Sequence, residues 1–559
     1  MKEGLAGEVL QHDLVLPVQT GNLEGSTGSG SVISGLQDQL PVPISNPGRP
    51  GNLSQVRGFG VSSEDVDTQS FGISLNPSQG GGFDLSAFPA FLWSGFTFQS
   101  GPSANGLNPS APSGTLSLKP WTVQALDSPT SIYRVGGFYS TAGAHQLFAG
   151  GRAQQPVAWV LGYSFLNATG PSAGLSSRWF GSMNEMGYSG GFHFLVTDVD
   201  AQAQGPVTAL SPLARMRTTR LIPVLESAYR WSSARVVKST FFTDFSILKY
   251  QDSSSGALSR DRVDQWGVEN SLELDSWRLG LSLRQASYFG IGFEAPQQTI
   301  GSFQASHVMG SGSWLVEPRF QATWVNGFGF LPQGSLGFRN EWGENQPTVF
   351  FRLGLSQRVP SLLDRYFSYK EFVGNPNLKT EESWNFTLGT EWRVGSWDSQ
   401  LQAFGQLRNH VRVPLNDTVT NLGGAEVLAI QNSVRYELNS FWILSHALVW
   451  SPSRVEATGR PFPYLPLWTE IMGATFRWGP SAQKAEWSAT LRASSSLGVR
   501  INSEETLPAF GVLDTALNWP LSRNLSFSAR VENLLNHPVQ WIAGYPVGRI
   551  VSFLLSGQI

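Results

Sequence analysis

The sequence lacks several features that would place it in a common class. None of its 559 residues is cysteine, which fits an oxidising envelope where a stray thiol is a liability. Only 14% of the residues are charged, whereas soluble domains carry about 25%. No run approaches the roughly 18 to 20 apolar residues that a membrane helix needs. These absences exclude helices as membrane-spanning elements and disfavour an ordinary soluble domain.

Basic and metal-ligating patterns are also missing. The formal net charge is −3, and a nucleic-acid-binding protein would show a basic stripe, so we expect no nucleic-acid partner. The seven histidines have no metal-ligand spacing, and we expect neither a metal nor a cofactor. Residues 170–174 match the G-x-S-x-G nucleophile elbow, but that motif needs a strand, a turn and a helix in an α/β sheet. Their surroundings are helix-poor, so we expect that the chain is not an enzyme.

The sequence is rich in glycine, in aromatic residues and in strictly alternating stretches. It has 60 Gly and 20 Trp. In 277–284, 486–493 and 525–532, apolar residues alternate with small or charged ones. The apolar sets are Trp277, Leu279, Leu281 and Leu283; Trp487, Ala489, Leu491 and Ala493; and Leu525, Phe527, Ala529 and Val531. Because Arg and Glu fall on the other phase, the pattern fits a lipid-facing outside and a water-filled lumen.

This alternation predicts an all-β membrane protein. Strand-like stretches recur about once per 20 residues from Trp121 onward, which predicts an antiparallel transmembrane β-barrel of about 22 strands over 121–559. A soluble β-sandwich array or a propeller would also alternate. It is disfavoured because a soluble core rarely accepts charges in phase along every strand while Trp and Phe fall at strand ends.

Residues 1–120 have a different texture, with dense Gly, Pro, Ser and Asn and broken alternation. Taken alone, this composition could belong to a disordered tail. We instead expect a separate domain, because the segment contains five ordered fragments. They are LPVQTGNLE (16–24), VISGLQDQLPVPIS (32–45), VRGFG (56–60), ISLNPSQGGGFDLSAFP (73–89) and SGPSANGLNPSAPSGTLSL (100–118).

Further motifs follow in the second part of the chain. They are FFRLGLSQRVPSLLDRYF (350–367), GNPNLKTEESWNFTLGTEW (374–392), and the closing VENLLN (531–536), GYPVGR (544–549) and VSFLL (551–555). In this order, the fragments and motifs resemble the TonB-dependent outer-membrane receptors over essentially the whole chain. The resemblance implies that 1–120 is a plug domain inside the barrel lumen and that the final strand seals the barrel.

The resemblance also implies a function and a location. Members of the family lie in the bacterial cell outer membrane, bind a scarce extracellular solute and release it inward when a TonB-type periplasmic motor protein remodels the plug. The expected ligand is a small or medium solute, such as a metal chelate, a cobalamin-like compound or a glycan. The other expected partners are the barrel assembly machinery and the lipid bilayer. The amino terminus lacks the pattern of a secretory signal, so we expect an export signal to have been removed or to lie upstream.

The resemblance assigns roles to individual residues of the plug and barrel. In the family, two plug arginines pair with barrel glutamates; here Arg57 keeps one position, while Ser100 replaces the other arginine. The matching barrel positions are Thr387 and Arg435, so we expect Glu382 or Glu437 to complete the plug–barrel lock with Arg57.

Two plug loops, 46–52 and 76–82, match the ligand-facing loops of the family. We therefore expect ligand contacts from side chains that donate hydrogen bonds to a polar solute, namely Arg49, Asn52, Asn76 and Gln79. The alternative is that these are turn residues chosen for backbone conformation. The acids of a long extracellular loop are expected on a solvated face; they are Asp364, Glu371, Glu381 and Glu382.

The motor-binding segment, or TonB box, has one candidate. It comprises Asp13, Leu14, Val15 and Leu16, which would add a strand to the motor protein; alternatively, these residues begin the first strand of the plug. A second function therefore stays open: a degenerate relative that no longer transports and serves as a structural or adhesive part of a surface complex. The missing lock charges favour it, whereas the ordered plug motifs and Arg57 favour transport.

Overall fold

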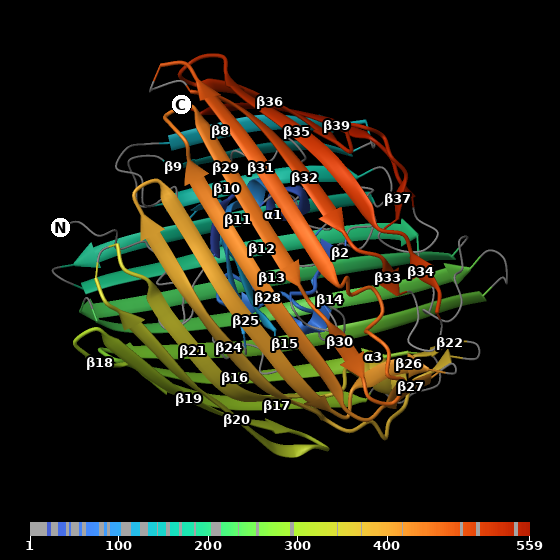
Figure 1. Ribbon diagram of the computed structural model, residues 1–559. Coiled ribbons are helices and arrows are strands. Elements are labelled where there is room, and N and C mark those ends of the chain that lie inside the picture. The colour runs from blue at the N-terminus through green and yellow to red at the C-terminus, as the bar shows by residue number, and fades with distance from the viewer. Residues whose placement is uncertain are drawn as a thin grey trace.

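The computed structural model describes most of the chain. The described residues are 19–23, 32–37, 39–40, 44–45, 55–58, 63–77, 83–85, 90–101, 113–122, 132–141, 144–152, 157–166, 170–183, 186–202, 214–232, 234–252, 257–290, 296–343, 345–369, 372–415, 418–480, 484–498, 504–540 and 546–558. They form a large closed barrel around a smaller sheet that is built from the first part of the chain (Figure 1).

Antiparallel strands make the wall of the barrel. Its first half contains β8 (Ile132–Ser140), β9 (Ala144–Arg152), β10 (Val157–Leu166), β11 (Gly170–Met183), β12 (Met186–Gln202), β13 (Ala214–Ser232), β14 (Arg235–Asp252), β15 (Ala257–Leu274), β16 (Trp277–Phe289), β17 (Gln297–His307), β18 (Met309–Ser311) and β19 (Trp314–Val325). Its second half contains β20 (Gly329–Glu341), β21 (Thr348–Arg358), β24 (Glu381–Val394), β25 (Trp397–Asn409), β28 (Ala425–Glu437), β29 (Trp442–Trp450), β30 (Ser453–Val455), β31 (Trp468–Trp478), β32 (Ala485–Ser494), β35 (Phe510–Pro520), β36 (Leu525–Glu532) and β39 (Ile550–Gln558).

The wall closes on itself. Within the described residues it has 24 strand segments, and because β18 continues β17 and β30 continues β29, these form 22 passes. The last strand, β39, pairs with the first, β8, from Ser552 opposite Ser140 to Gln558 opposite Arg134. The predicted antiparallel barrel of about 22 strands is confirmed.

Alternation along each strand separates an apolar outside from a polar inside, because successive side chains of a strand point to opposite faces. On β16, Leu281 is 60% exposed and Leu283 is also exposed, whereas the alternate Arg284 turns inward and bonds to the buried Glu269 of β15. Further along the wall, Arg352 and Glu317 are fully buried and lie 3.0 Å apart. The inward charges are therefore paired with one another, as a low-dielectric interior requires.

The two ends of the barrel differ in their connections. At one end, which we call the short-turn end, β24 passes to β25 through 395–396 and β28 passes to β29 through 438–441. At the other, the long-loop end, connections such as 359–380, 410–424 and 495–509 carry structure of their own. That structure comprises α3 (Leu362–Tyr366), a sheet of β22 (Ser368–Tyr369), β23 (Phe372–Val373), β27 (Thr418–Asn421) and β26 (Arg412–Leu415), and the pairs β33 (Leu497–Gly498) with β34 (Thr506–Leu507) and β37 (Val539–Gln540) with β38 (Pro546–Val547).

Helices are few and short in the described part of the chain. The helix α1 (Val32–Gln37) has six residues and α3 has five. In α3, Ser361 and Asp364 form a capping box that satisfies the first backbone amides. No helix among the described residues is long and apolar enough to cross a membrane.

The first part of the chain forms what we call the inner domain, the described residues between 19 and 122. Its five-stranded sheet has the order β1 (Gln19–Asn22), β6 (Trp93–Ser100), β7 (Gly114–Pro120), β4 (Val66–Ser70) and β5 (Ile73–Ser74), with β4 and β7 parallel. The remaining elements are α1, β2 (Ile44–Ser45) paired with β3 (Gln55–Val56), and the 3-10 turns η1 (Ser63–Asp65) and η2 (Ala90–Leu92). The barrel strands surround this domain (Figure 1).

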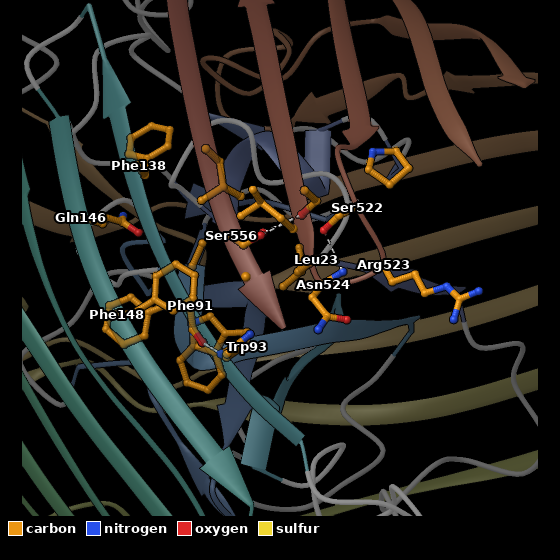
Figure 2. Close-up of a pocket in the computed structure, with 17 residues that line it drawn as sticks. Leu23, Phe91, Trp93, Phe138, Gln146, Phe148, Ser522, Arg523, Asn524 and Ser556 are labelled. Carbon is orange, nitrogen blue, oxygen red and sulfur yellow. Dashed lines mark hydrogen bonds between the residues drawn. The ribbon is translucent and has the colours of Figure 1, made fainter. Parts of the chain in front are cut away.

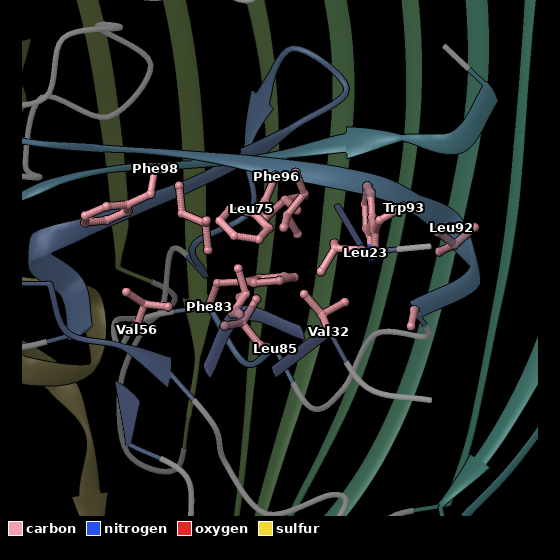
Figure 3. Packing of buried hydrophobic residues seen from close by; sticks show 14 of the residues in the cluster. Leu23, Val32, Val56, Leu75, Phe83, Leu85, Leu92, Trp93, Phe96 and Phe98 are labelled. Carbon is pink, nitrogen blue, oxygen red and sulfur yellow. The ribbon is translucent and has the colours of Figure 1, made fainter. Parts of the chain in front are cut away.

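Apolar side chains pack between the sheet of the inner domain and α1 (Figure 3). This core includes Leu23, Val32, Leu75, Phe83 and Phe96. Every residue of β6 is buried, on both faces of the strand. A strand buried on both faces needs cover on both sides, and here the barrel wall provides the second cover, since Val160, Val224 and Phe404 belong to the same apolar cluster.

Candidate functional site

The contact between the inner domain and the barrel wall contains a buried group of charges. Asp65, at the end of η1, is fully buried between two barrel arginines. Arg408 donates to its Oδ2 at 2.6 Å and Arg358 donates to its Oδ1 at 3.1 Å. The neighbouring Glu64 lies 3.1 Å from the same Nη1 of Arg358. One short turn of the inner domain therefore anchors two strands of the wall, β21 and β25.

The same group of charges extends into the loops at the long-loop end. Arg358 also donates to Glu381 at 2.6 Å between Nε and Oε2. Arg412 of β26 lies 3.5 Å from Glu64, bonds to Asp364 of α3 and lies 3.7 Å from Glu381. We call these residues the charge cluster; they are Glu64, Asp65, Asp364, Glu381, Arg358, Arg408 and Arg412.

Strand periodicity explains why the wall presents these charges inward. Arg358 shares its phase on β21 with the buried Arg352, and Glu381 shares its phase on β24 with the buried Ser383 and Asn385. Arg408 continues a polar row, because it donates to Gln406 at 2.6 Å, which in turn donates to Asn385 at 2.7 Å. The inward face of β21, β24 and β25 is thus a hydrogen-bonded polar wall.

Further polar contacts join the edge of the inner domain to this wall. Gln19 of β1 donates to Gln400 at 3.3 Å, and Ser100 at the end of β6 donates to Gln402 at 3.1 Å. Gln402 also donates to Gln431 of β28 at 2.8 Å. Amide and hydroxyl groups can exchange such partners for water at small net cost. The hydrogen bonds that hold this side of the inner domain can therefore be exchanged for hydrogen bonds to water.

An aromatic contact holds the opposite side. The turn between β4 and β5 places Phe71 at a φ of 53°, where its ring stacks on His193 of β12 at 4.0 Å and lies 5.2 Å from the ring of Trp93. Next to it, Gly72 has a φ of 75°, and a Cβ there would lie 2.7 Å from Oγ1 of Thr240. Glycine avoids both this close contact and the strain of a positive φ. We call Phe71, Gly72, Trp93 and His193 the aromatic seat.

A second aromatic contact lies where the barrel closes. The ring of Phe91 in η2 stacks on Phe148 of β9 at 5.6 Å, and the guanidinium of Arg134 lies 4.1 Å from the ring centre of Trp121. Beside them is a cavity of about 230 Å³, bounded by η2, β8, β9, β36, β39 and the turn at 522–524 (Figure 2). Ligand pockets have volumes of roughly 300 to 1,000 Å³, so we interpret this cavity as a packing gap.

The predicted lock residue Arg57 is half-buried and forms no ion pair with a glutamate of the described residues. Its Nη1 donates to the carbonyl of Pro463 at 3.3 Å, and its guanidinium lies 5.8 Å from the ring centre of Tyr464. Burial lowers the pKa of Arg57, and Tyr464 and Asp65 oppose that shift. Arg57 therefore ties the inner domain to the loop at 456–467.

The structure does not bring the two expected glutamates to Arg57. Glu382 shares its strand phase with Trp384, which is exposed on the outside of the barrel, and it accepts from Gln357 at 3.4 Å. Glu437 lies at the short-turn end, is exposed, and pairs with Arg435 at 3.4 Å. Glu382 therefore points out of the barrel, and Glu437 lies at the end of its strand opposite to the charge cluster.

The polarity of the ion pairs is therefore the reverse of the family pattern. In the family pattern the plug supplies arginines and the wall supplies glutamates; here Glu64 and Asp65 come from the inner domain, while Arg358 and Arg408 come from the wall. The expectation of a solvated face is wrong for Glu381, whose side chain is 3% exposed in the charge cluster, whereas Asp364 stays partly exposed while it bonds to Arg412. Glu371 lies outside the described residues.

Of the expected ligand residues, the structure describes only Asn76. Its Nδ2 donates to the carbonyl of Val66 at 2.8 Å and its Oδ1 accepts from the amide of Thr68 at 3.1 Å. Both ends of its amide thus bind the backbone of β4, as the alternative interpretation expected of a turn residue. The other predicted residues lie outside the described residues; they are Arg49, Asn52 and Gln79, and Asp13, Leu14, Val15 and Leu16 of the motor-binding segment.

Comparisons with known proteins agree with this architecture. The family model described as TonB dependent receptor-like, beta-barrel, matches residues 16–534. The solved copper transporter OprC has a TM-score of 0.79 at 11% identity, with 97% of this chain and 98% of that chain covered.

Two further solved structures are similar. The FrpB iron transporter from Neisseria meningitidis has a TM-score of 0.76 at 12% identity, with coverage of 97% and 99% of the two chains. The siderophore receptor PirA from Acinetobacter baumannii has a TM-score of 0.77 at 13% identity, with coverage of 98% and 98%. At these identities, the likeness shows the fold. A search of curated proteins gives no match.

Proposed function

Because the chain belongs to the TonB-dependent receptor family, we propose that it is a bacterial outer-membrane receptor that imports a scarce extracellular solute. In this proposal the inner domain is the plug, the solute passes chemically unchanged, and the chain is not an enzyme. The observation that carries the proposal is the charge cluster, which fixes the inner domain within the closed wall through Asp65, Arg358 and Arg408. A barrel of this width would otherwise leave a continuous pore.

The chemistry of the contact favours a plug that moves. A buried ion-pair network contributes little net free energy, because the cost of desolvating its ions offsets their mutual attraction. If water entered the contact at β21 and β25, Asp65 and the two arginines would be solvated together. A wall sealed only by apolar packing would offer no such release. The polar side of the contact thus supports import by displacement of the inner domain.

The solute would enter from the long-loop end, where the charge cluster joins the inner domain to α3 and β26. Glu64 and Asp364 keep 22% and 24% side-chain exposure there, so they are accessible to a solute. The solved relatives are named for copper, iron or siderophore. For this chain we propose a metal chelate, a cobalamin-like compound or a glycan, with Arg49, Asn52 and Gln79 among its contacts.

Coupling to the periplasmic motor protein is testable with the full-length chain in detergent. Proline at position 14 would remove a backbone donor from the proposed added strand. We expect the periplasmic domain of the motor to bind the unchanged chain and the control Leu5→Pro equally, and Leu14→Pro more than about tenfold more weakly. Equal binding by all three chains would contradict the proposed segment, and no binding by any of them would contradict coupled import.

The second candidate function is a degenerate relative that has become a structural or adhesive part of a surface complex. One observation favours it: the buried guanidinium of Arg57 meets a carbonyl and a ring where the family pattern has a carboxylate. Absence of motor binding by the full-length chain would favour this function over import.

A further inference from the structure

A histidine and a glutamate lie on the outer, lipid-facing side of the wall, where β29 pairs with β31 (Figure 1). Along β29 the even-numbered residues point outward, as the exposed Leu444 and Trp450 show. His446 is on the same phase, and its side chain is 39% exposed. Glu470 of β31 shares the outward phase of the exposed Met472, and its side chain is 27% exposed. The Nε2 atom of His446 lies 2.9 Å from Oε1 of Glu470.

This pair lies inside the apolar band of the barrel. On β29, Trp442 and Trp450 each stand four residues from His446, one toward each end of the strand. Eight residues of a strand tilted by about 40° span about 20 Å along the barrel axis, and aromatic residues mark both edges of the apolar band. His446 is therefore near the middle of the bilayer. Glu470 is two residues inside Trp468, which stands directly opposite Trp450.

Lipid cannot satisfy the polar groups at this depth. Charged residues on the lipid face destabilise a barrel most at the bilayer midplane, and a polar group without a partner is costly in hydrocarbon. Within the described residues, one ring nitrogen of His446 and one carboxylate oxygen of Glu470 have no partner. Asn432 of β28 faces outward diagonally from His446, and its side chain forms no hydrogen bond in the described part of the chain. This face therefore has unused donors and acceptors.

The arrangement of the pair is complementary to itself. Two copies inserted in the same direction can be related by a twofold axis parallel to the membrane normal, and twofold dimers are the commonest oligomers. Because Nε2 and Oε1 lie 2.9 Å apart, their depths in the bilayer differ by no more than that distance. A twofold axis between the two side chains thus brings His446 of each copy against Glu470 of the other. A partner of different sequence would need a matching acid and base of its own at this depth.

We propose that the outer face of β28, β29 and β31 binds a second copy of this chain within the membrane, through reciprocal contacts between His446 and Glu470. Small outward residues beside the pair let two walls approach closely; they are Ala474, which stands opposite Ala489, and Ala493, which stands opposite Glu470. This surface is independent of import and would pair two barrels whether or not the inner domain moves.

Cross-linking through a single introduced cysteine tests the proposal, because the chain has none of its own. Met472 stands directly opposite His446 and so lies beside the proposed axis. We expect full-length Met472→Cys, oxidised in phosphatidylcholine vesicles, to form disulfide-linked dimers on a non-reducing gel. The matched control is Leu283→Cys, since Leu283 is exposed at the middle of β16 on another arc of the wall. A disulfide needs Cα atoms within about 7 Å, so the control should cross-link at least about tenfold less.

Charge substitutions in the Met472→Cys chain test whether the pair holds the copies together. Glu470→Lys leaves two basic groups and no acceptor, and like charges across an interface are strongly unfavourable, so the cross-linked fraction should fall more than about tenfold. His446→Glu/Glu470→Lys reverses both signs and should restore it. Leu283→Lys places the same ammonium on the lipid face of β16 and should leave the cross-linked fraction unchanged.

Four outcomes would overturn the proposal. The first is equal cross-linking of Met472→Cys and Leu283→Cys, and the second is a Glu470→Lys variant that cross-links as well as its parent. The third is a reversed pair, His446→Glu/Glu470→Lys, that fails to restore the dimer. The fourth is an adduct of Met472→Cys with a different membrane protein in intact cells, in place of a second copy.

Discussion

The inner domain meets the barrel through two regions that differ in chemistry. In the charge cluster, Asp65 lies between Arg358 and Arg408, all of them buried. In the aromatic seat, Phe71 stacks on His193. Stacked rings stabilise a contact because they exclude water. A buried ion pair adds little net stability, but the loss of one partner destabilises the contact strongly. We infer that the aromatic seat supplies affinity and that the charge cluster fixes position and permits release.

The largest expected effect comes from removing one charge of the cluster. Asp65→Asn would place an amide nitrogen against an arginine and leave Arg358 and Arg408 with less compensating charge. We expect the inner domain to lose about 4 kcal/mol of stability within the barrel. With a urea slope of about 1.5 kcal/mol per M, the urea concentration at which the protein begins to conduct in a planar bilayer should fall by about 2.5 M.

The matched control removes both charges of the Asp65–Arg408 pair. In Asp65→Asn/Arg408→Gln, Arg358 keeps Glu64 and Glu381 as ionic partners, so the urea midpoint should return to within about 1 M of the original value. A double variant that conducts as readily as Asp65→Asn would contradict the distinction between the two regions.

The next largest effect concerns the aromatic seat. Phe71→Ala removes a fully buried ring from between His193 and Trp93, and we expect a loss of about 3 kcal/mol. Unlike Asp65→Asn, this loss should not be recovered by a second substitution of a facing residue to alanine. The same urea titration of conductance measures this loss of stability. If Phe71→Ala/His193→Ala were more stable than Phe71→Ala, the aromatic seat would behave like the charge cluster, and the distinction between the two regions would be contradicted.

The sequence predicted the barrel because alternation is a local pattern. Leu281 and Trp487 are exposed as their strand phase required. The same rule contained evidence against Glu382, since it shares a phase with Trp384 and Phe386, which are lipid-facing. The direction of a side chain can thus be predicted from its immediate neighbours in the sequence.

The charge cluster could not be predicted in this way. Asp65 and its partners Arg358 and Arg408 are separated by 293 and 343 residues, so no local pattern relates them. Likewise, Asp364 follows a loop motif, and only the fold of 359–380 back over the inner domain brings it to Arg412. The resemblance predicted an ionic lock, but the residues that form it, and their reversed polarity, required the structure.

A smaller loss of stability is expected from a substitution at Gly72 in the aromatic seat. Gly72→Ala would add a methyl group 2.7 Å from Oγ1 of Thr240 at a φ of 75°, and we expect a loss of about 1 to 2 kcal/mol. In Gly72→Ala/Thr240→Ala the contact is relieved and only the backbone strain remains. The double variant should therefore be more stable than Gly72→Ala in the urea titration; equal stability would show that the contact does not matter.

The smallest effect is expected at Arg57. This residue is half-buried and forms one hydrogen bond to a carbonyl and a contact with Tyr464, and the desolvation of its guanidinium offsets much of that gain. We expect Arg57→Met to change the stability of the inner domain by less than about 1 kcal/mol. A loss as large as that of Asp65→Asn would show that Arg57 acts as a lock residue after all.

The central claim is that the inner domain closes the barrel as a plug that can be displaced. A cross-link tests it directly, because the chain has no cysteine and a Cβ at Gly72 would lie 3.7 Å from Cβ of Thr240, within the range of a disulfide. In Gly72→Cys/Thr240→Cys, urea should open a conducting pore only after reduction, and the oxidised protein should stay closed. Equal currents from the oxidised and reduced protein would contradict the account.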